Sequence, residues 1–512
     1  MKTKVLIIGA GPTGLMAACQ LKRFGIDCVI LDKKEGPTTE SRALVVHARS
    51  LEIYDQMGIA DQAVQEGEVV KGLQFIVHDK MVQHVPLGAV GEGLSPFPFL
   101  LILEQSKNEE LLYEHLKKLG GDVWWQTELV TVSQEAERCY ADVNRNGTSL
   151  RIEADWIIAA DGGRSTVRHQ FHIPFEGDTY EHIFYVVDTK LAWRWGHEAL
   201  SVYLSKQTFM ALFPMKGESR FRIVGILPLE FQNEHPEHFE QLIPYLQKEV
   251  EVPLSFSDTS WFSVYRVHHR CVENFRSGRV FFAGDAAHIH SPVGGQGMNT
   301  GLQDAYNIAW KLAYVINGFA AEKILDTYNA ERLPFAKQLV HTTDRAFSVV
   351  SSDDGYNRFL RESVLPVAAR FLFRFTVMRQ RIFKTISQIA IKYDASQFIQ
   401  NDSSGKIAVR AGERFPYVQT KEGKSVYDLM PEPNFYAVLF SFNNKKEIEA
   451  VKSLQETYPF LHVLDLSDEP KISAVLKIKK ETIVVVRPDH YIGLITDKGA
   501  AAVTAYFEKM TR

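Results

Sequence analysis

Three glycines near the N-terminus have the spacing of a phosphate-binding turn. Gly9, Gly11 and Gly14 follow the apolar run Val5–Ile8 and precede a helical pattern over Leu15–Phe24. Such glycines allow a tight strand-to-helix turn, a close approach of the backbone to a pyrophosphate, and close packing of helix on strand. The unpaired N–H groups at the start of the helix would then face the phosphates. The pattern predicts a dinucleotide-binding site.

A second apolar run supplies a carboxylate for the same ligand. Cys28–Leu31 is followed by Asp32, at about 20 residues from the glycines, which is the spacing of an acidic residue that binds ribose hydroxyls. The combination of strand, glycine turn, helix and carboxylate favours a nucleotide site over a plain glycine turn.

Two later stretches also place polar residues where a strand should end. IIAADGGRST at 157–166 carries Asp161 and Gly162 after an apolar run, and Gly284–Asp285 follows the strand-like run Val280–Ala283. Parallel sheets bind ligands at the carboxyl ends of their strands. We therefore expect all three stretches to form one site.

The segment after Asp285 is rich in glycine. Gly294, Gly295 and Gly297 would let the backbone lie against a flat ring, and a helix is expected over Gly301–Leu312. His288 and His290 form an HxH pattern, but no carboxylate or thiol recurs at metal-ligand spacing. We therefore expect no metal site here.

Taken together, these motifs resemble the para-hydroxybenzoate hydroxylase type of single-component flavoprotein monooxygenase. The resemblance is closest to the longer branch, which contains phenol and polyketide hydroxylases. It implies that the first motif holds the ADP part of FAD and that Asp161–Gly162 is associated with both FAD and the nicotinamide cofactor. It also implies that Asp285 lies on the ribityl chain.

Further matches extend the resemblance over nearly the whole chain. SRALVVHARSLEIYDQMGI at 41–59 places Arg42 on the family's FAD-contacting arginine, EQSKNEELL at 104–112 places Gln105 on its flavin-contacting glutamine, and Pro292–Asn299 corresponds to the loop beside the isoalloxazine. The resemblance implies catalytic roles for Arg42, Pro292 and Asn299. The residues expected to bind cofactor are Gly9, Gly11, Pro12, Thr13, Gly14, Asp32, Lys33, Arg42, Gln105, Asp161, Gly162, Gly284, Asp285, Pro292, Gly295, Gln296, Gly297, Met298 and Asn299.

The resemblance also implies a reaction. Non-covalent FAD would be reduced by NAD(P)H and would react with O2 to form a C4a-hydroperoxide, which hydroxylates an aromatic or polyketide-like small molecule such as an antibiotic. Only one dinucleotide fingerprint is present, so we expect NAD(P)H to bind transiently against the flavin domain. The four cysteines form no close pair, which argues against a flavin disulfide reductase.

Two other functions are weighed on the same scaffold. A flavin halogenase would show the signature GWxWxIP, but Trp193–Arg194–Trp195 is followed by Gly196–His197. A non-catalytic binding protein, like the carriers of prenylated GTPases, would lack an intact GD motif and need not hold FAD.

Bulk properties agree with a cytoplasmic enzyme. The 512 residues are 45% hydrophobic and 23% charged, with a formal net charge of −4, which gives no electrostatic case for nucleic acid or for stable membrane association. The N-terminus opens directly into the first strand, so no signal peptide is expected. We expect a monomer or a homodimer.

The order of the motifs requires a discontinuous flavin domain. We expect an α/β fold: a Rossmann-type FAD-binding domain over 1–175 and 277–395, an inserted antiparallel substrate-binding sheet over 176–276, and a thioredoxin-like domain over 406–512. A polar linker is expected at 401–405. The last domain contains no cysteine, so it has no thiol chemistry. It also contains no cofactor motif, so we expect a docking or dimerisation role and FAD binding that does not depend on it.

Within the insert, strand-like runs are expected at His182–Trp193, Ala199–Leu204, Phe209–Pro214 and Phe221–Ile226, with one helix near His235–Val250. Aromatic residues in these runs either line a pocket for a planar substrate or form plain core. These residues are Tyr203, Phe209, Phe213 and Phe221. His47 follows Arg42 closely and is expected to be structural.

Overall fold

The computed structural model of the chain describes residues 1–39, 41, 43–77, 80–204, 209–231, 233–250, 252–291, 293–351, 375–394 and 396–512. Arg42 and Pro292, two of the residues expected to be catalytic, lie outside the described residues.

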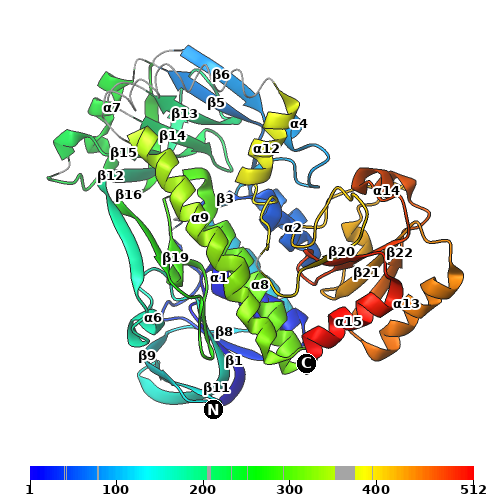
Figure 1. Cartoon of the computed structure of the whole chain (residues 1–512). Helices are drawn as coiled ribbons and strands as arrows, with labels where there is room; N and C mark the ends of the chain where they lie inside the picture. The colour runs from blue at the N-terminus through cyan, green and yellow to red at the C-terminus, as the bar shows by residue number, and fades with distance from the viewer. Residues whose placement is uncertain are drawn as a thin grey trace.

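The first sheet has the expected Rossmann-type core. β1 (Lys2–Ile8) pairs in parallel with β2 (Cys28–Leu31) and with β11 (Thr148–Ala159), and β11 pairs in parallel with β18 (Val280–Phe282). The carboxyl ends of four strands therefore share one edge, where all three motifs begin (Figure 1). Around this core lie β8 (Val123–Trp124), β9 (Thr127–Gln134), β10 (Cys139–Arg145) and β17 (Arg276–Ser277).

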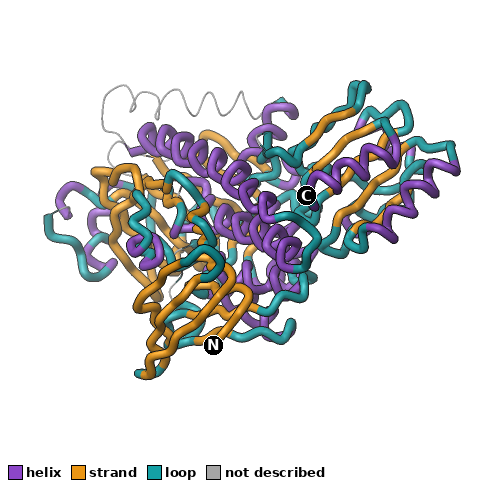
Figure 2. Tube along the Cα trace, turned by 60° about the horizontal axis from the view of Figure 1, so that its bottom comes forward, coloured by secondary structure: helices purple, strands orange, loops and turns teal. Residues whose placement is uncertain are grey.

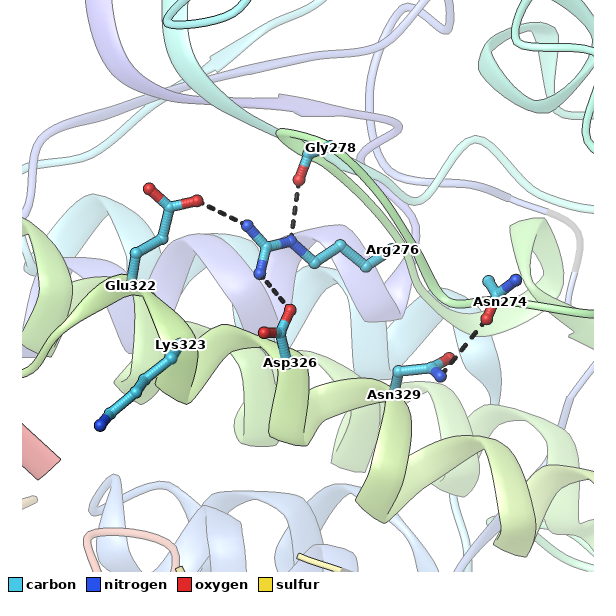
Figure 3. Close-up of a pocket in the computed structure, with 7 residues that line it drawn as sticks. All are labelled: Asn274, Arg276, Gly278, Glu322, Lys323, Asp326 and Asn329. Atoms are coloured by element: carbon cyan, nitrogen blue, oxygen red, sulfur yellow. Dashed lines mark hydrogen bonds and ion pairs between the residues drawn. The ribbon is translucent and has the colours of Figure 1, made fainter. Parts of the chain in front are cut away.

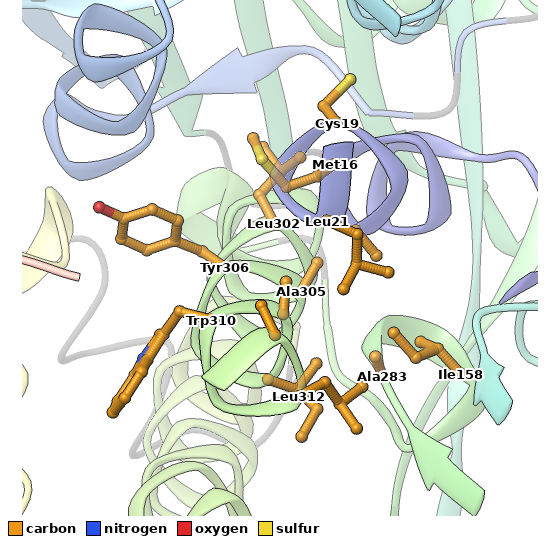
Figure 4. Packing of buried hydrophobic residues seen from close by; sticks show 14 of the residues in the cluster. Met16, Cys19, Leu21, Ile158, Ala283, Leu302, Ala305, Tyr306, Trp310 and Leu312 are labelled. Atoms are coloured by element: carbon orange, nitrogen blue, oxygen red, sulfur yellow. The ribbon is translucent and has the colours of Figure 1, made fainter. Parts of the chain in front are cut away.

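Helices that pack on one another form the main core beside this sheet. The central one is α1 (Pro12–Arg23), which packs against α8 (Gln296–Ile316) and α5 (Gln105–Lys118). Figure 4 shows Met16 and Leu21 of α1 beside Leu302 and Ala305 of α8, and all four side chains are buried. The core thus holds the first and third motifs in a fixed relation.

The second sheet is larger than the expected insert. Its order is β19-β16-β12-β15-β14-β13-β5-β6, so two strands from 72–86 and one from 288–289 join the strands of 176–276. The boundaries 1–175 and 176–276 therefore describe this sheet incompletely. Its strands are β5 (Gly72–Val77), β6 (Lys80–Pro86), β12 (Phe175–Ala192), β13 (Ala199–Leu204), β14 (Phe209–Pro214), β15 (Arg220–Ile226), β16 (Ser255–Val272) and β19 (His288–Ile289).

The helix expected near 235–250 is shorter than the sequence suggested. α7 spans Ile243–Glu249, with Pro244 in its first turn. Proline is tolerated there but lacks the N–H that a helix interior needs, so the helix starts only just before it.

The remaining helices connect and cover the two sheets. α9 (Asp326–Ser351) runs beside α8, and α2 (Ala48–Gln56) contacts the start of α8 (Figure 1). Among the residues that the structure describes, no helix is both long enough and apolar enough to cross a membrane. The other elements are α3 (Ala60–Glu66), α4 (Gly88–Gly91), α6 (Thr166–Gln170), α12 (Thr376–Ile386), β3 (Val45–Val46), β4 (Glu68–Val70), β7 (Leu100–Ile102), and the 3-10 turns η1 (Leu229–Phe231), η2 (Phe239–Gln241), η5 (Glu322–Leu325) and η7 (Tyr427–Leu429).

The C-terminal residues form a separate lobe (Figure 2). A βαβ unit is followed by a helix, an antiparallel hairpin and a last helix, which is the arrangement of a thioredoxin-like domain. The expected linker at 401–405 is partly wrong, because β20 (Gln400–Asp402) pairs with β24 at the edge of this sheet. The other elements are β21 (Phe435–Phe440), α13 (Lys445–Thr457), β22 (Leu461–Asp465), α14 (Pro470–Leu476), β23 (Thr482–Val486), β24 (Ile492–Thr496) and α15 (Gly499–Thr511).

Candidate functional site

The first glycine motif leaves open space at one glycine only. Gly9 has φ +101°, and a Cβ there would overlap the carbonyl oxygen of Ala160; a Cβ on Gly14 would overlap the carbonyl oxygen of Gly9. A Cβ on Gly11 would meet nothing within 4 Å. No side chain caps α1, whose first residue is Pro12. The uncapped N-terminus beside open space suits an anionic group.

Asp32 lies at the end of β2, beside this turn. Its Oδ2 accepts a hydrogen bond from the N–H of Ala10 at 2.7 Å, and its Oδ1 accepts one from the N–H of Lys34 at 2.9 Å. These bonds fix the carboxylate while leaving it partly exposed, as a ribose-binding residue requires. The neighbouring Lys33 is exposed.

The first and third motifs touch through Thr13. A Cβ on Gly284, which has φ +58°, would lie 2.6 Å from Thr13 Oγ1, and one on Gly301 would also overlap that oxygen. Gly284 is buried, whereas Asp285, next along η3 (Gly284–Ala286), is exposed. The tight packing behind Gly284 thus presents the Asp285 carboxylate outward at the edge of the sheet.

The second motif carries a carboxylate oxygen without a partner. Asp161 Oδ2 accepts a hydrogen bond from the N–H of Val167 at 3.2 Å, but Oδ1 is shielded from solvent and has no partner. Burial raises the pKa of this carboxyl. Gly162, with φ +79°, faces open space. A buried acceptor without a donor is costly, so this oxygen is suited to a hydroxyl or amide donor from a ligand.

The glycine-rich segment is a turn and not an extended loop. η4 (Val293–Gly295) leads into α8, which begins at Gln296, before the expected start at Gly301. Gly294 and Gly295 have φ +76° and +62°. A Cβ on Gly295 would lie 2.6 Å from that of Val45. Only glycine fits this close approach of two backbone segments.

The side chains in the first turn of α8 are engaged by the protein. Gln296 Nε2 donates to the carbonyl oxygen of Ile386 at 2.9 Å, and Met298 Sδ accepts from Asn108 Nδ2 at 3.2 Å. The chain itself therefore engages the Gln296 amide nitrogen and the Met298 sulfur. Gly297 lies against His290.

Asn299 joins this turn to the segment before α2. Its Oδ1 accepts from the N–H of His47 and from Ser50 Oγ, and its Nδ2 donates to the carbonyl oxygens of Val45 and Gly295, all at 2.8 Å. The side chain is fully buried. With both atoms of its amide used by the chain, Asn299 acts as a positioning residue.

His47 adds a fifth bond to the same junction. Its Nε2 donates to the carbonyl oxygen of Gly294 at 2.8 Å, while Nδ1 is buried and has no partner. Burial lowers the pKa of this imidazole to about 4. A neutral ring held in this way supports the structural role expected from the sequence.

Gln105 fixes the chain on both sides of Arg42. Its backbone N–H donates to Ser41 Oγ at 2.6 Å, and its Oε1 accepts from the N–H of Ala43 at 3.1 Å. Its Nε2 donates to the buried carboxylate of Glu109 at 2.9 Å. The expected glutamine thus bonds Ser41 and Ala43, whereas Arg42 lies outside the described residues.

His288, the first residue of the HxH pattern, contacts a carboxylate that the sequence reasoning missed. Asp304 is fully buried and accepts from His288 Nε2 at 2.7 Å, from Arg332 Nε at 2.8 Å and from the N–H of Gly284 at 3.1 Å. It therefore anchors the GD motif from behind. Within the described ranges, no group of three or more His, Cys, Asp and Glu side chains could hold a metal ion.

A sequence signal could have revealed Asp304. α8 is mostly apolar, yet it carries buried polar residues at helical spacing, which is unusual unless each has a partner. These residues are Asn299, Thr300, Gln303, Asp304, Asn307 and Lys311.

The C-terminal lobe docks through buried charges. Arg487 donates to both oxygens of Glu331 at 2.7 and 2.8 Å and to Asp489, and Lys311 donates to Glu331 at 2.8 Å. Each of these four residues is at most 2% exposed. The expected docking role is therefore fulfilled within the chain itself.

This interface reaches the segment next to the glycine turn. Arg49 of α2 is buried and donates to the carbonyl oxygen of Asp489 at 2.6 Å and to Glu52 at 3.1 Å. Arg414 of the lobe also donates to Glu52, at 3.0 Å. Because Arg49 precedes Ser50, which bonds Asn299, the lobe is one residue away from the junction. These contacts argue against a flavin site that is independent of residues 406–512.

A surface recess of about 610 Å³ lies away from the motifs. It is formed around Arg276, before β18, whereas Gly284 follows that strand. Figure 3 shows the Arg276 guanidinium bonded to Glu322, Asp326 and the carbonyl oxygen of Gly278. All three nitrogens of the Arg276 guanidinium are therefore engaged by the chain.

Comparisons with known proteins agree with the geometry. A family model described as an FAD binding domain matches residues 2–343. A 6-methylpretetramide 4-monooxygenase from Streptomyces rimosus is 37% identical over 423 residues, covering 80% of this chain and 73% of the relative. A flavin-dependent monooxygenase from Mycobacteroides abscessus is 30% identical over 510 residues, covering 97% of each chain. The structure of OxyS anhydrotetracycline hydroxylase from Streptomyces rimosus matches with a TM-score of 0.81 and 25% identity, covering 100% of this chain and 99% of its own.

Proposed function

The chain belongs to the FAD binding domain family, and from this premise we propose that it uses NAD(P)H and O2 to hydroxylate an aromatic, polyketide-like small molecule. It is an FAD-dependent monooxygenase of aromatic substrates, with FAD as its cofactor. The observation that carries the proposal is the convergence of Gly11, Asp161 and Asp285 on one edge of the parallel sheet.

The residues at this edge fit FAD. We assign the open space at Gly11 and the N-terminus of α1 to the pyrophosphate, and Asp32 to the ribose. The exposed Asp285 carboxylate would accept hydrogen bonds from the ribityl hydroxyls, and the turn at Gly294–Gly295 would lie beside the flat ring. Bound FAD supplies the redox chemistry and the activation of oxygen, while the protein binds, orients and excludes water.

The nicotinamide donor is assigned to an open face near Asp161. The chain has one dinucleotide fingerprint, at Gly9–Gly14, and FAD occupies it. The Asp161 carboxylate, whose Oδ1 has no hydrogen-bond partner in the chain, is the first candidate for binding this donor. Arg42, which the family resemblance singles out, is the second candidate for this role.

The relatives support the substrate class. Their names describe enzymes that act on 6-methylpretetramide and anhydrotetracycline, which are fused-ring polyketides. An apolar cluster including Leu44, Val45 and Phe213 joins the second sheet to the glycine turn and would keep water from the reacting carbon. We therefore propose a polycyclic aromatic substrate, antibiotics included.

The test is a substrate screen on the purified full-length protein. The protein should be yellow, and denaturation should release its FAD, because no covalent link is expected. Tetracyclines, rifamycins, anthraquinones and simple phenols are then added with NADH or NADPH in air, and NAD(P)H consumption is measured together with product mass. A product heavier by one oxygen atom supports the proposal. A colourless protein that does not bind added FAD would refute it.

A further inference from the structure

A buried ion pair stands on one face of the second sheet. Arg222 of β15 donates through Nε and Nη2 to the two carboxylate oxygens of Asp188 on β12, both at 2.6 Å. The two residues are 2% and 5% exposed, and they lie directly opposite each other in the antiparallel register. Cross-strand partners share a face, so both project from the same side of the sheet.

That side is the one that faces the flavin motifs. Phe213 lies opposite Arg222 on β14 and packs in the cluster that contains Val45, which in turn fills the space at Gly295. Arg220, two residues before Arg222, reaches Glu104, the neighbour of Gln105, at 3.5 Å. The opposite face is a closed core: Tyr203 and Phe221 pack there with residues next to and within α7.

The wall around the ion pair is aromatic and only partly covered. The Arg222 guanidinium lies over the Trp261 ring, 4.9 Å from its centroid, and Trp261 is the cross-strand partner of Asp188. Tyr265 lies on the same face, opposite Phe184. Trp261, Tyr265 and Phe213 are partly exposed. A flat aromatic molecule would find ring surface here.

One nitrogen of the guanidinium is left over. Arg222 Nη1 is buried and has no hydrogen-bond partner. A buried donor without an acceptor destabilises the folded protein, and the cost is larger when the donor is charged. An ion pair with a purely structural role would gain no stability from an unpaired nitrogen. Arg276 offers a contrast within the chain, because all three of its nitrogens are bonded (Figure 3). Arg222 has the donor that a ligand oxygen would complete.

We propose that Arg222, held in place by Asp188, binds a carbonyl or phenolate oxygen of the aromatic substrate while Trp261 and Tyr265 lie against its rings. The assignment rests on the proposed function. Because Asp188 already balances the charge of Arg222, the site favours a polarised ring oxygen over a free carboxylate. Arg222 would thereby set which edge of the substrate faces the flavin.

The experiment measures binding of alizarin, a dihydroxyanthraquinone, to the FAD-loaded full-length protein by quenching of tryptophan fluorescence. Arg222→Met should weaken binding about 10- to 100-fold, the range for a hydrogen bond to a charged group. Arg276→Met, which disrupts an arginine pair at the remote recess, should stay within twofold of the unaltered protein. Retained FAD absorbance shows that the flavin site is intact in each variant.

Removing Arg222 alone leaves the Asp188 carboxylate buried and unpaired, which is destabilising. The double variant Asp188→Leu, Arg222→Met removes both charges, a change that buried pairs often tolerate, and it should lose alizarin binding to the same extent. Affinity within twofold of the unaltered protein in either variant would overturn the assignment, as would an unaltered protein that holds FAD but does not bind alizarin. A chain that holds no FAD would instead overturn the proposed function.

Discussion

Acid should weaken the junction at the glycine turn through His47. Burial lowers the pKa of this imidazole to about 4 in the folded protein, from an ordinary value of 6.5. Between these two values the unfolded chain binds more protons than the folded one, so stability rises with pH across the window. The stabilising effect of a neutral His47 is complete above pH 6.5 and is lost progressively as the pH falls towards 4.

The size of the effect follows from the same two values. Proton linkage for one such group amounts to about 2 kcal/mol of lost stability between pH 7 and pH 5. The stability that is lost is that of the glycine turn, because His47 Nε2 donates to the carbonyl oxygen of Gly294. Burial, and the charge of Arg49 nearby, lower the pKa of His490 to about 3. This histidine therefore adds a similar dependence of stability on pH.

The assay compares the unaltered protein with His47→Gln, whose side-chain amide can still donate to Gly294 but does not titrate. Urea unfolding is followed by release of FAD fluorescence at pH 7, 6 and 5. The variant should lose about 2 kcal/mol less than the unaltered protein over this range, while His84→Gln, at an exposed position, should not differ from it. Equal pH slopes for His47→Gln and the unaltered protein would refute the reasoning.

Three further changes test the site. Asp285→Ala should weaken FAD binding by about one to two decades in a fluorescence titration, because it removes a charged acceptor; unchanged affinity would show that the motif is misassigned. Asn299→Asp should speed FAD dissociation at least about tenfold in stopped flow, since a carboxylate would face the carbonyl oxygen of Gly295 without a donor; an unchanged rate would count against its positioning role. Deleting 406–512 should cost about 1.5–3 kcal/mol, the range for a hydrogen bond to a charged group, because Glu331 loses Arg487 and keeps only Lys311 and Asn307; a soluble truncated chain with normal FAD content would contradict the interface described above.

The flavin motifs could be predicted from the sequence because each is determined by residues that are close together in the chain. The turn at Gly9–Gly14 requires glycine because of contacts with the strand and helix on either side of it. That strand and helix were therefore expected close to where they occur. β2 begins and ends at the expected residues, Cys28 and Leu31.

Long-range pairing explains what the sequence did not reveal. β5 joins the second sheet because it pairs in parallel with β13, more than a hundred residues later, and nothing local to 72–77 specifies that partner. The polar run at 400–402 becomes a strand only because β24 offers an edge. The ion pair of Arg222 and Asp188 was hidden in the same way, because strands β12 and β15 meet only in the folded sheet.

The buried charges of the C-terminal lobe determine how it meets the flavin domain. An apolar interface can shift in register at little cost, but Arg487 must meet Glu331 while Arg414 meets Glu52, or charges are left buried without partners. These pairs fix the lobe against α2 and α9, and the bond from Trp310 to the Asp489 carboxylate fixes it against α8. Asn299 ties α2 and α8 to the glycine turn. A thioredoxin-like unit without cysteine can therefore matter to a flavin site it never touches, because its docking determines the position of the backbone that does.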